Sequence, residues 1–69
     1  MNNMQELTIL QKFRIARDLQ GHTTEQVAEK LNYSKRYIYE VLRHPEKNKE
    51  LHKKIMDYMS RPFVNNQLN

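Results

Sequence analysis

The chain has 69 residues and carries 12 Lys and Arg against 8 Asp and Glu, which gives a formal net charge of +4 at pH 7. This length allows one domain with a marginal core, and the absence of cysteine excludes a disulfide framework and a thiolate zinc site. No apolar run approaches the roughly 18 residues that cross a bilayer, and no signal peptide is visible, so we expect a cytoplasmic protein.

The first predicted helix runs from about Met4 to Leu19. Its apolar face consists of residues spaced three or four apart, namely Ile9, Phe13, Ala16 and Leu19. Gly21 follows and is expected to end the helix, because glycine adopts the left-handed backbone of a C-terminal cap. Leu7 and Ile15 fall outside this face. They are either a dimer or partner surface or ordinary exposed apolar residues.

Two short amphipathic helices are predicted next, from Thr24 to Leu31 and from Lys35 to Arg43. The apolar face of the first is formed by Val27, Ala28 and Leu31, and that of the second by Ile38, Val41 and Leu42. Each stripe is too short to be stable alone, so the two helices must pack together. The small side chain of Ala28 would allow them to approach closely.

Capping residues mark the ends of these two helices. Thr23 and Gln26 have the spacing of a capping box, in which each side chain satisfies a backbone N–H of the first turn. Asn32 tolerates a left-handed backbone conformation, and Ser34 can cap the helix that follows. These signals predict a tight turn between the two helices.

His44-Pro45 ends the third helix, because a residue before proline disfavours the helical backbone. A fourth helix is predicted from about Glu46 or Asn48 to Met59, and Arg61-Pro62 is expected to end it. Its apolar stripe is Leu51, Ile55, Tyr58 and Met59. The prediction is therefore an all-α, four-helix domain over residues 1–60, followed by a short polar tail over residues 61–69.

The segment GHTTEQVAEKLNYSKRYIYEVL, residues 21–42, resembles the DNA-binding helix-turn-helix of the phage-repressor and Cro type, the Xre-like family. The family pattern has a small residue in its first helix, glycine in the turn, a capping serine and a branched residue in its second helix. The residues at these positions are Ala28, Asn32, Ser34 and Ile38. Asparagine thus replaces glycine in the turn. The resemblance implies a lambda-repressor-like fold whose second helix enters the DNA major groove.

Residues of the third helix that point away from Ile38 are predicted to contact bases, and the resemblance assigns the same positions: Lys35, Arg36, Tyr39, Glu40 and Arg43. Arg36 and Arg43 are the best candidates, because a guanidinium matches the two acceptors of guanine. Glu40 either orients Arg36, four residues before it, or forms an ordinary surface ion pair. For Tyr39, packing beside the core is the alternative.

A second set of residues is predicted to contact DNA phosphates: Thr23, Thr24, Gln26, Tyr37, Lys47 and Lys49. The first three lie at a helix N-terminus, where free N–H groups hold anions. Residues 35–69 carry eight bases against four acids, whereas residues 1–34 are balanced, so the excess charge begins at the third helix. The alternatives are solvated lysines, and core packing for Tyr37.

Catalysis has little support, since the three histidines, His22, His44 and His52, are scattered and Gly21 is the single glycine. We expect no enzymatic activity, no metal and no cofactor. The favoured function is that of a sequence-specific transcriptional regulator of the phage-repressor or Cro sort, which binds operator DNA as a homodimer and either blocks or recruits polymerase. One alternative is a protein-binding inhibitor or anti-repressor that uses Leu7, Ile15, Tyr37 and Tyr39. The other is a DNA-bending protein of the excisionase type.

Overall fold

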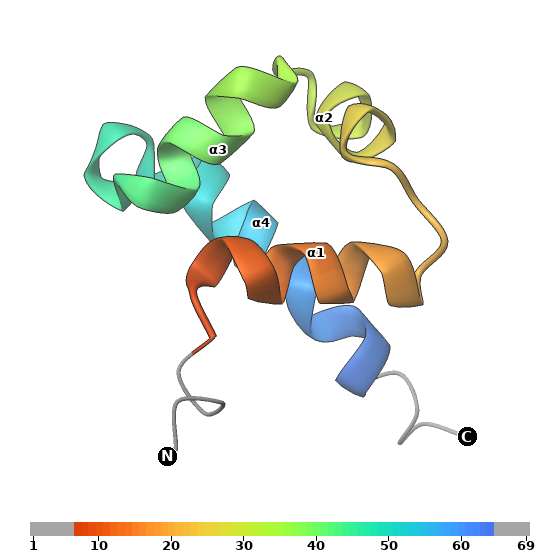
Figure 1. Ribbon diagram of the computed structural model, residues 1–69. Coiled ribbons are helices and arrows are strands. Elements are labelled where there is room, and N and C mark those ends of the chain that lie inside the picture. The colour runs from red at the N-terminus through yellow and green to blue at the C-terminus, as the bar shows by residue number, and fades with distance from the viewer. Residues whose placement is uncertain (1–6, 65–69) are drawn as a thin grey trace.

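The computed structural model describes residues 7–64, which form four α-helices and one short 3₁₀ helix, with no strand in this range. The elements are α1 (Ile9–Leu19), α2 (Thr24–Leu31), α3 (Lys35–Arg43), η2 (Pro45–Lys47) and α4 (Lys49–Val64). Figure 1 shows α2 and α3 on one side of α1, with α4 crossing behind α1. The predicted all-α fold and the predicted bounds of α2 and α3 are confirmed.

The turn between α2 and α3 is built as the sequence predicts. Asn32 has a left-handed backbone with φ 68°, which asparagine tolerates better than other side chains. Ser34 accepts a hydrogen bond from the backbone N–H of Tyr37 at 3.1 Å and so caps α3. At the start of α2, Thr23 and Gln26 form the reciprocal capping box. Side-chain caps therefore fix the N-termini of both helices of the helix-turn-helix.

The predicted start of α1 is wrong for Leu7 and Thr8, which precede the helix, whereas Met4 lies outside the described residues. Thr8 forms a second capping box with Gln11, in which its hydroxyl oxygen accepts the N–H of Gln11 at 3.1 Å. A residue that caps a helix has an extended backbone and cannot lie within it. The Thr-x-x-Gln spacing of Thr23 and Gln26 is thus repeated at Thr8 and Gln11. The prediction from apolar periodicity alone extended the helix past this cap.

The link between α3 and α4 contains a 3₁₀ turn that the sequence pattern does not reveal. Pro45 occupies the first position of η2, where its missing N–H costs nothing. Asn48 then accepts the backbone N–H of Leu51 at 3.0 Å through its side-chain oxygen. Since this contact caps α4, the helix begins at Lys49, one residue after the later of the two predicted starts.

The prediction that Arg61-Pro62 ends the last helix is wrong, because α4 continues through Pro62 to Val64. Proline has no N–H to donate to the carbonyl four residues earlier, which here belongs to Tyr58. The side chain of Gln20 supplies a replacement, donating from Nε2 to the Tyr58 carbonyl oxygen at 3.0 Å. Residues 61–64 of the predicted tail are thus helical, and residues 65–69 lie outside the described residues.

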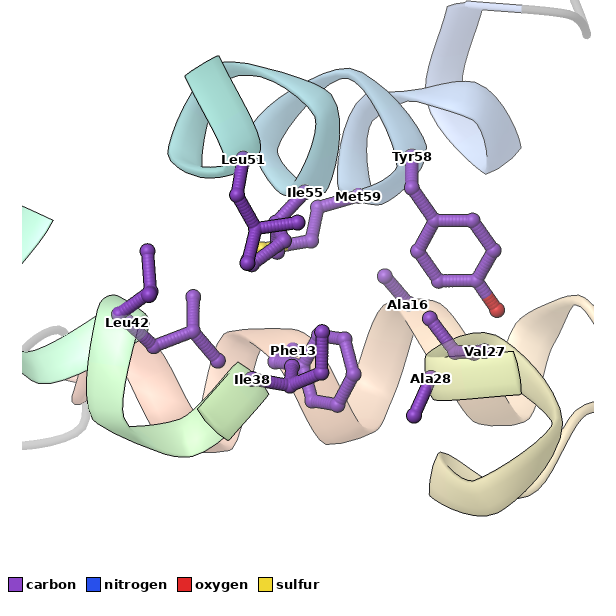
Figure 2. Packing of buried hydrophobic residues seen from close by; sticks show 11 residues of the cluster. Phe13, Ala16, Val27, Ala28, Ile38, Leu42, Leu51, Ile55, Tyr58 and Met59 are labelled. Carbon is purple, nitrogen blue, oxygen red and sulfur yellow. The ribbon is translucent and has the colours of Figure 1, made fainter. Parts of the chain in front are cut away.

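The core joins all four helices (Figure 2), and its centre is Phe13, Ile38, Val41, Leu51 and Ile55, all at most 1% exposed. The predicted apolar faces supply these side chains. Leu19 is the exception, with 61% of its surface exposed, because it lies at the edge of the stripe where α1 ends. Among residues 7–64, no helix is both long and apolar enough to cross a membrane.

Candidate nucleic-acid interface

The outer face of α3 carries two arginines that have no acidic partner among residues 7–64. Ile38 and Val41 are completely buried, so the opposite side of the helix faces solvent. Arg36 and Arg43 lie on that side and are exposed. Neither takes part in an ion pair among residues 7–64. Both guanidinium groups are therefore available to an external acceptor.

Lys35, at the first position of α3, is paired with an acid of α2. Its ammonium lies 2.9 Å from a carboxylate oxygen of Glu25. This hydrogen bond lowers the pKa of Glu25 and raises that of Lys35, so both groups are charged at neutral pH. A phosphate or base that binds Lys35 would have to replace Glu25, and the net electrostatic gain would be smaller than for an unpaired lysine.

Glu40 lies 2.9 Å from the ammonium of Lys47, and no ion pair with Arg36 is found in the described part of the chain. The predicted pairing with Arg36 is therefore wrong. Because η2 turns the chain back along α3, it brings Lys47 beside this carboxylate. The hydrogen bond from Lys47 holds the pKa of Glu40 below the usual value. Lys47, predicted to contact phosphate, is thus already engaged with an acid.

Tyr39 links the interface to the core. Its ring meets Phe13 edge-on, with 6.1 Å between ring centres, and it is half-buried. Its hydroxyl lies 3.1 Å from the hydroxyl of Thr24, whose side chain is only 6% exposed. The prediction that the Thr24 side chain contacts phosphate therefore needs correction, because its hydroxyl lies inside the protein. The base contact of Tyr39 stays a prediction.

Tyr37 packs on Tyr33, with ring centres 5.2 Å apart, and is half-buried. It borders a hollow of about 270 Å³ on the outer side of α3. The hollow is lined by Ser34, Arg36, Tyr37, Glu40 and Lys47. Four of these are predicted DNA-contacting residues. The fifth, Ser34, was predicted only as the cap of α3, and it has that role.

Three other predicted phosphate contacts lie on the surface. Thr23 and Gln26 are exposed at the start of α2, where Gln26 uses its side-chain oxygen to accept the N–H of Thr23 at 2.8 Å. Its amide nitrogen thus points to no partner among the described residues. Lys49 is exposed at the start of α4. All three can reach an anion without breaking an ion pair.

Among residues 7–64, no three His, Asp or Glu side chains are grouped in a way that could hold a metal ion. A sequence profile of the homeodomain-like domain family matches residues 6–50, which is more than half of the chain and includes α1, α2 and α3. The comparisons with curated proteins and with solved structures find no match.

Proposed function

We propose that this chain, which belongs to the family of homeodomain-like domains, binds double-stranded DNA by inserting α3 into the major groove. The observation that carries the proposal is a pair of exposed arginines, Arg36 and Arg43, which form no ion pair within the described part of the chain and lie on a helix whose other face is fully buried. A guanidinium is well suited to the two acceptors of a guanine edge. A rigidly packed helix would hold both groups at fixed positions along the groove.

The remaining residues of the interface take supporting roles in this proposal. Lys35, Tyr39 and Glu40 lie beside the arginines and complete the base-contacting face. Glu40 is suited to accept a hydrogen bond from a cytosine amino group once Lys47 turns to a phosphate. The phosphate contacts come from both flanks, through Thr23, Gln26, Tyr37, Lys47 and Lys49.

A finer proposal concerns the biological role. We propose a cytoplasmic, sequence-specific transcriptional repressor of the phage-repressor type, without enzymatic activity, which occupies an operator and blocks polymerase. The support is the resemblance of residues 21–42 to that type of helix-turn-helix. Two copies would bind a pseudo-palindromic site with recognition helices roughly 34–36 Å apart.

The surface that supports the homodimer is an apolar groove between α1 and α4, of about 440 Å³. Its lining is Leu7, Lys12, Ile15, Met56, Met59 and Ser60. Leu7, Ile15 and Met56 are large apolar side chains exposed to solvent. A second copy of the chain presents the same apolar surface, and mutual burial would add to the marginal core of a small domain.

Salt dependence provides the test of the main proposal. Affinity for duplex DNA selected from a random pool should fall by orders of magnitude between ~50 and ~200 mM salt, because several phosphates are contacted. Negligible affinity for duplex DNA at any salt would overturn the proposal and favour a protein-binding module that uses Leu7 and Ile15. A large change in gel mobility on binding would indicate a bending protein of the excisionase type.

A further inference from the structure

A second groove lies between α2 and α4, and we name it the α2–α4 groove. It has a volume of about 420 Å³, within the range of ligand-binding pockets. Its floor is apolar and comes from both helices, with Val27 and Leu31 from α2 and Tyr58 from α4. Figure 2 shows the Tyr58 ring extending from α4 toward Val27. The groove is thus a hollow with a hydrophobic base.

The rim of the α2–α4 groove is strongly basic. Lys30 on α2 and Lys54 and Arg61 on α4 line it, against a single acid, Asp57. All three cations are exposed, and none forms an ion pair within residues 7–64. The rim therefore differs from α3, where two of the four cations near its surface are held by acids.

The α2–α4 groove lies on the side of α2 that is turned away from α3. Glu25 marks the side of α2 that faces α3, because it pairs with Lys35. Lys30 follows Glu25 by five residues, which places it about 140° further around the helix. The groove therefore lies on a different face of α2 from Lys35 and α3, whereas the proposed phosphate contact Gln26 is one turn before Lys30 on the same face.

We propose that the α2–α4 groove binds an acidic segment of a partner protein, which places apolar side chains on the floor and carboxylates against the rim. Lys54 and Arg61 are seven residues apart, so they are separated by about 10 Å along α4. A single small anion cannot span this distance, whereas a peptide with several carboxylates can. Val27 and Tyr58 are already buried, so Leu31, which is half-buried, is the apolar side chain that an occupant can cover. A phosphate backbone offers no apolar group for this contact, so DNA is the poorer occupant.

The probe is a fluorescein-labelled peptide of about twelve residues composed of Asp, Glu, Leu and Phe, titrated with the full chain and followed by fluorescence anisotropy. The matched variants are Lys54→Glu and Lys53→Glu, which change the net charge equally on adjacent exposed residues, of which only Lys54 lines the groove. Lys54→Glu should weaken binding by about tenfold or more, because it sets a like charge against the peptide. Lys53→Glu should have a much smaller effect.

Two further measurements make the test decisive. In amide NMR spectra, the peptide should shift signals of residues 27–31 and 54–61, and an excess of duplex DNA should leave these shifts in place. A peptide with Ser in place of Leu and Phe should bind more weakly, because it cannot cover the apolar floor. Equal losses in the two lysine variants, shifts confined to α3, or displacement by DNA would overturn the proposal, whether or not DNA binding itself is found.

Discussion

At the scale of single residues, the cations near α3 divide into two groups. Arg36 and Arg43 have no ion-pair partner in the stretch from residue 7 to residue 64, whereas Lys35 and Lys47 each lie 2.9 Å from a carboxylate. A paired lysine exchanges one anion for another when DNA binds, so its contribution to affinity is reduced. The arginines lose only hydration. We therefore expect sequence discrimination to come mainly from the arginines.

Replacing Arg36 with Ala should relax the preference for one base pair. The expected loss is about 1–3 kcal/mol of discrimination at that position, the usual contribution of a good arginine-guanine pair. Lys49→Ala is the matched control, since it removes an exposed, unpaired cation from the flank. It should weaken all sequences alike and reduce the salt slope by about one. Equal losses on selected and random duplexes for both variants would contradict the assignment of Arg36 to base readout.

Replacing Tyr39 with Phe separates its structural role from its predicted DNA contact. The hydroxyl of Tyr39 is the hydrogen-bond partner of the buried Thr24 hydroxyl, so its removal should lower the free energy of unfolding by about 1 kcal/mol. Tyr37→Phe removes a hydroxyl for which no hydrogen bond is found among the described residues, and should leave stability unchanged. Urea denaturation measures both. Unchanged stability of Tyr39→Phe together with an altered base preference would identify Tyr39 as a reader of DNA.

At the scale of elements, local signals predicted most of the fold. Apolar spacing and the caps at Thr23, Asn32 and Ser34 gave α2 and α3 with their observed bounds. The box at Thr8 is equally local, so the start of α1 was predictable from the same rule. The continuation of α4 through Pro62 could not be predicted in this way, because it involves Gln20. This residue lies more than forty residues before Pro62 in the chain and is brought close only by folding.

The contact between Gln20 and the Tyr58 carbonyl oxygen can be tested by a double-mutant cycle with Pro62. Gln20→Ala should lower the free energy of unfolding by about 1 kcal/mol, because it leaves that carbonyl without a donor. In a Pro62→Ala background the N–H of residue 62 can reach the same oxygen. The loss should then shrink, which gives a coupling of about 0.5–1 kcal/mol. Additive effects in urea denaturation would show that Gln20 does not compensate for the proline.

At the scale of the whole molecule, the sequence could not give the pairing of charges or the grooves. The ion pairs Glu25–Lys35 and Glu40–Lys47 depend on how α2, α3 and η2 pack against one another. For Glu40, the spacing within α3 had indicated Arg36 as the partner instead. The two grooves likewise lie between helices distant in the chain. The exposure of Leu7 and Ile15 was apparent from the helical pattern, but the contribution of Met56 from α4 was not.

The apolar groove between α1 and α4 gives the last prediction. Ile15 is 43% exposed and lines it, so Ile15→Glu would place a carboxylate inside a dimer interface built there, and burial of an unpaired charge is strongly unfavourable. Leu19→Glu is the control, since Leu19 is exposed on the same helix but does not line the groove. In sedimentation experiments Ile15→Glu should raise the dimer dissociation constant by about tenfold or more, and Leu19→Glu much less. Wild-type protein should bind a duplex with two half-sites more tightly than a duplex with one. This difference in affinity should disappear in Ile15→Glu and persist in Leu19→Glu. Dimers of unchanged stability in both variants would exclude this face as the interface and direct the search to another.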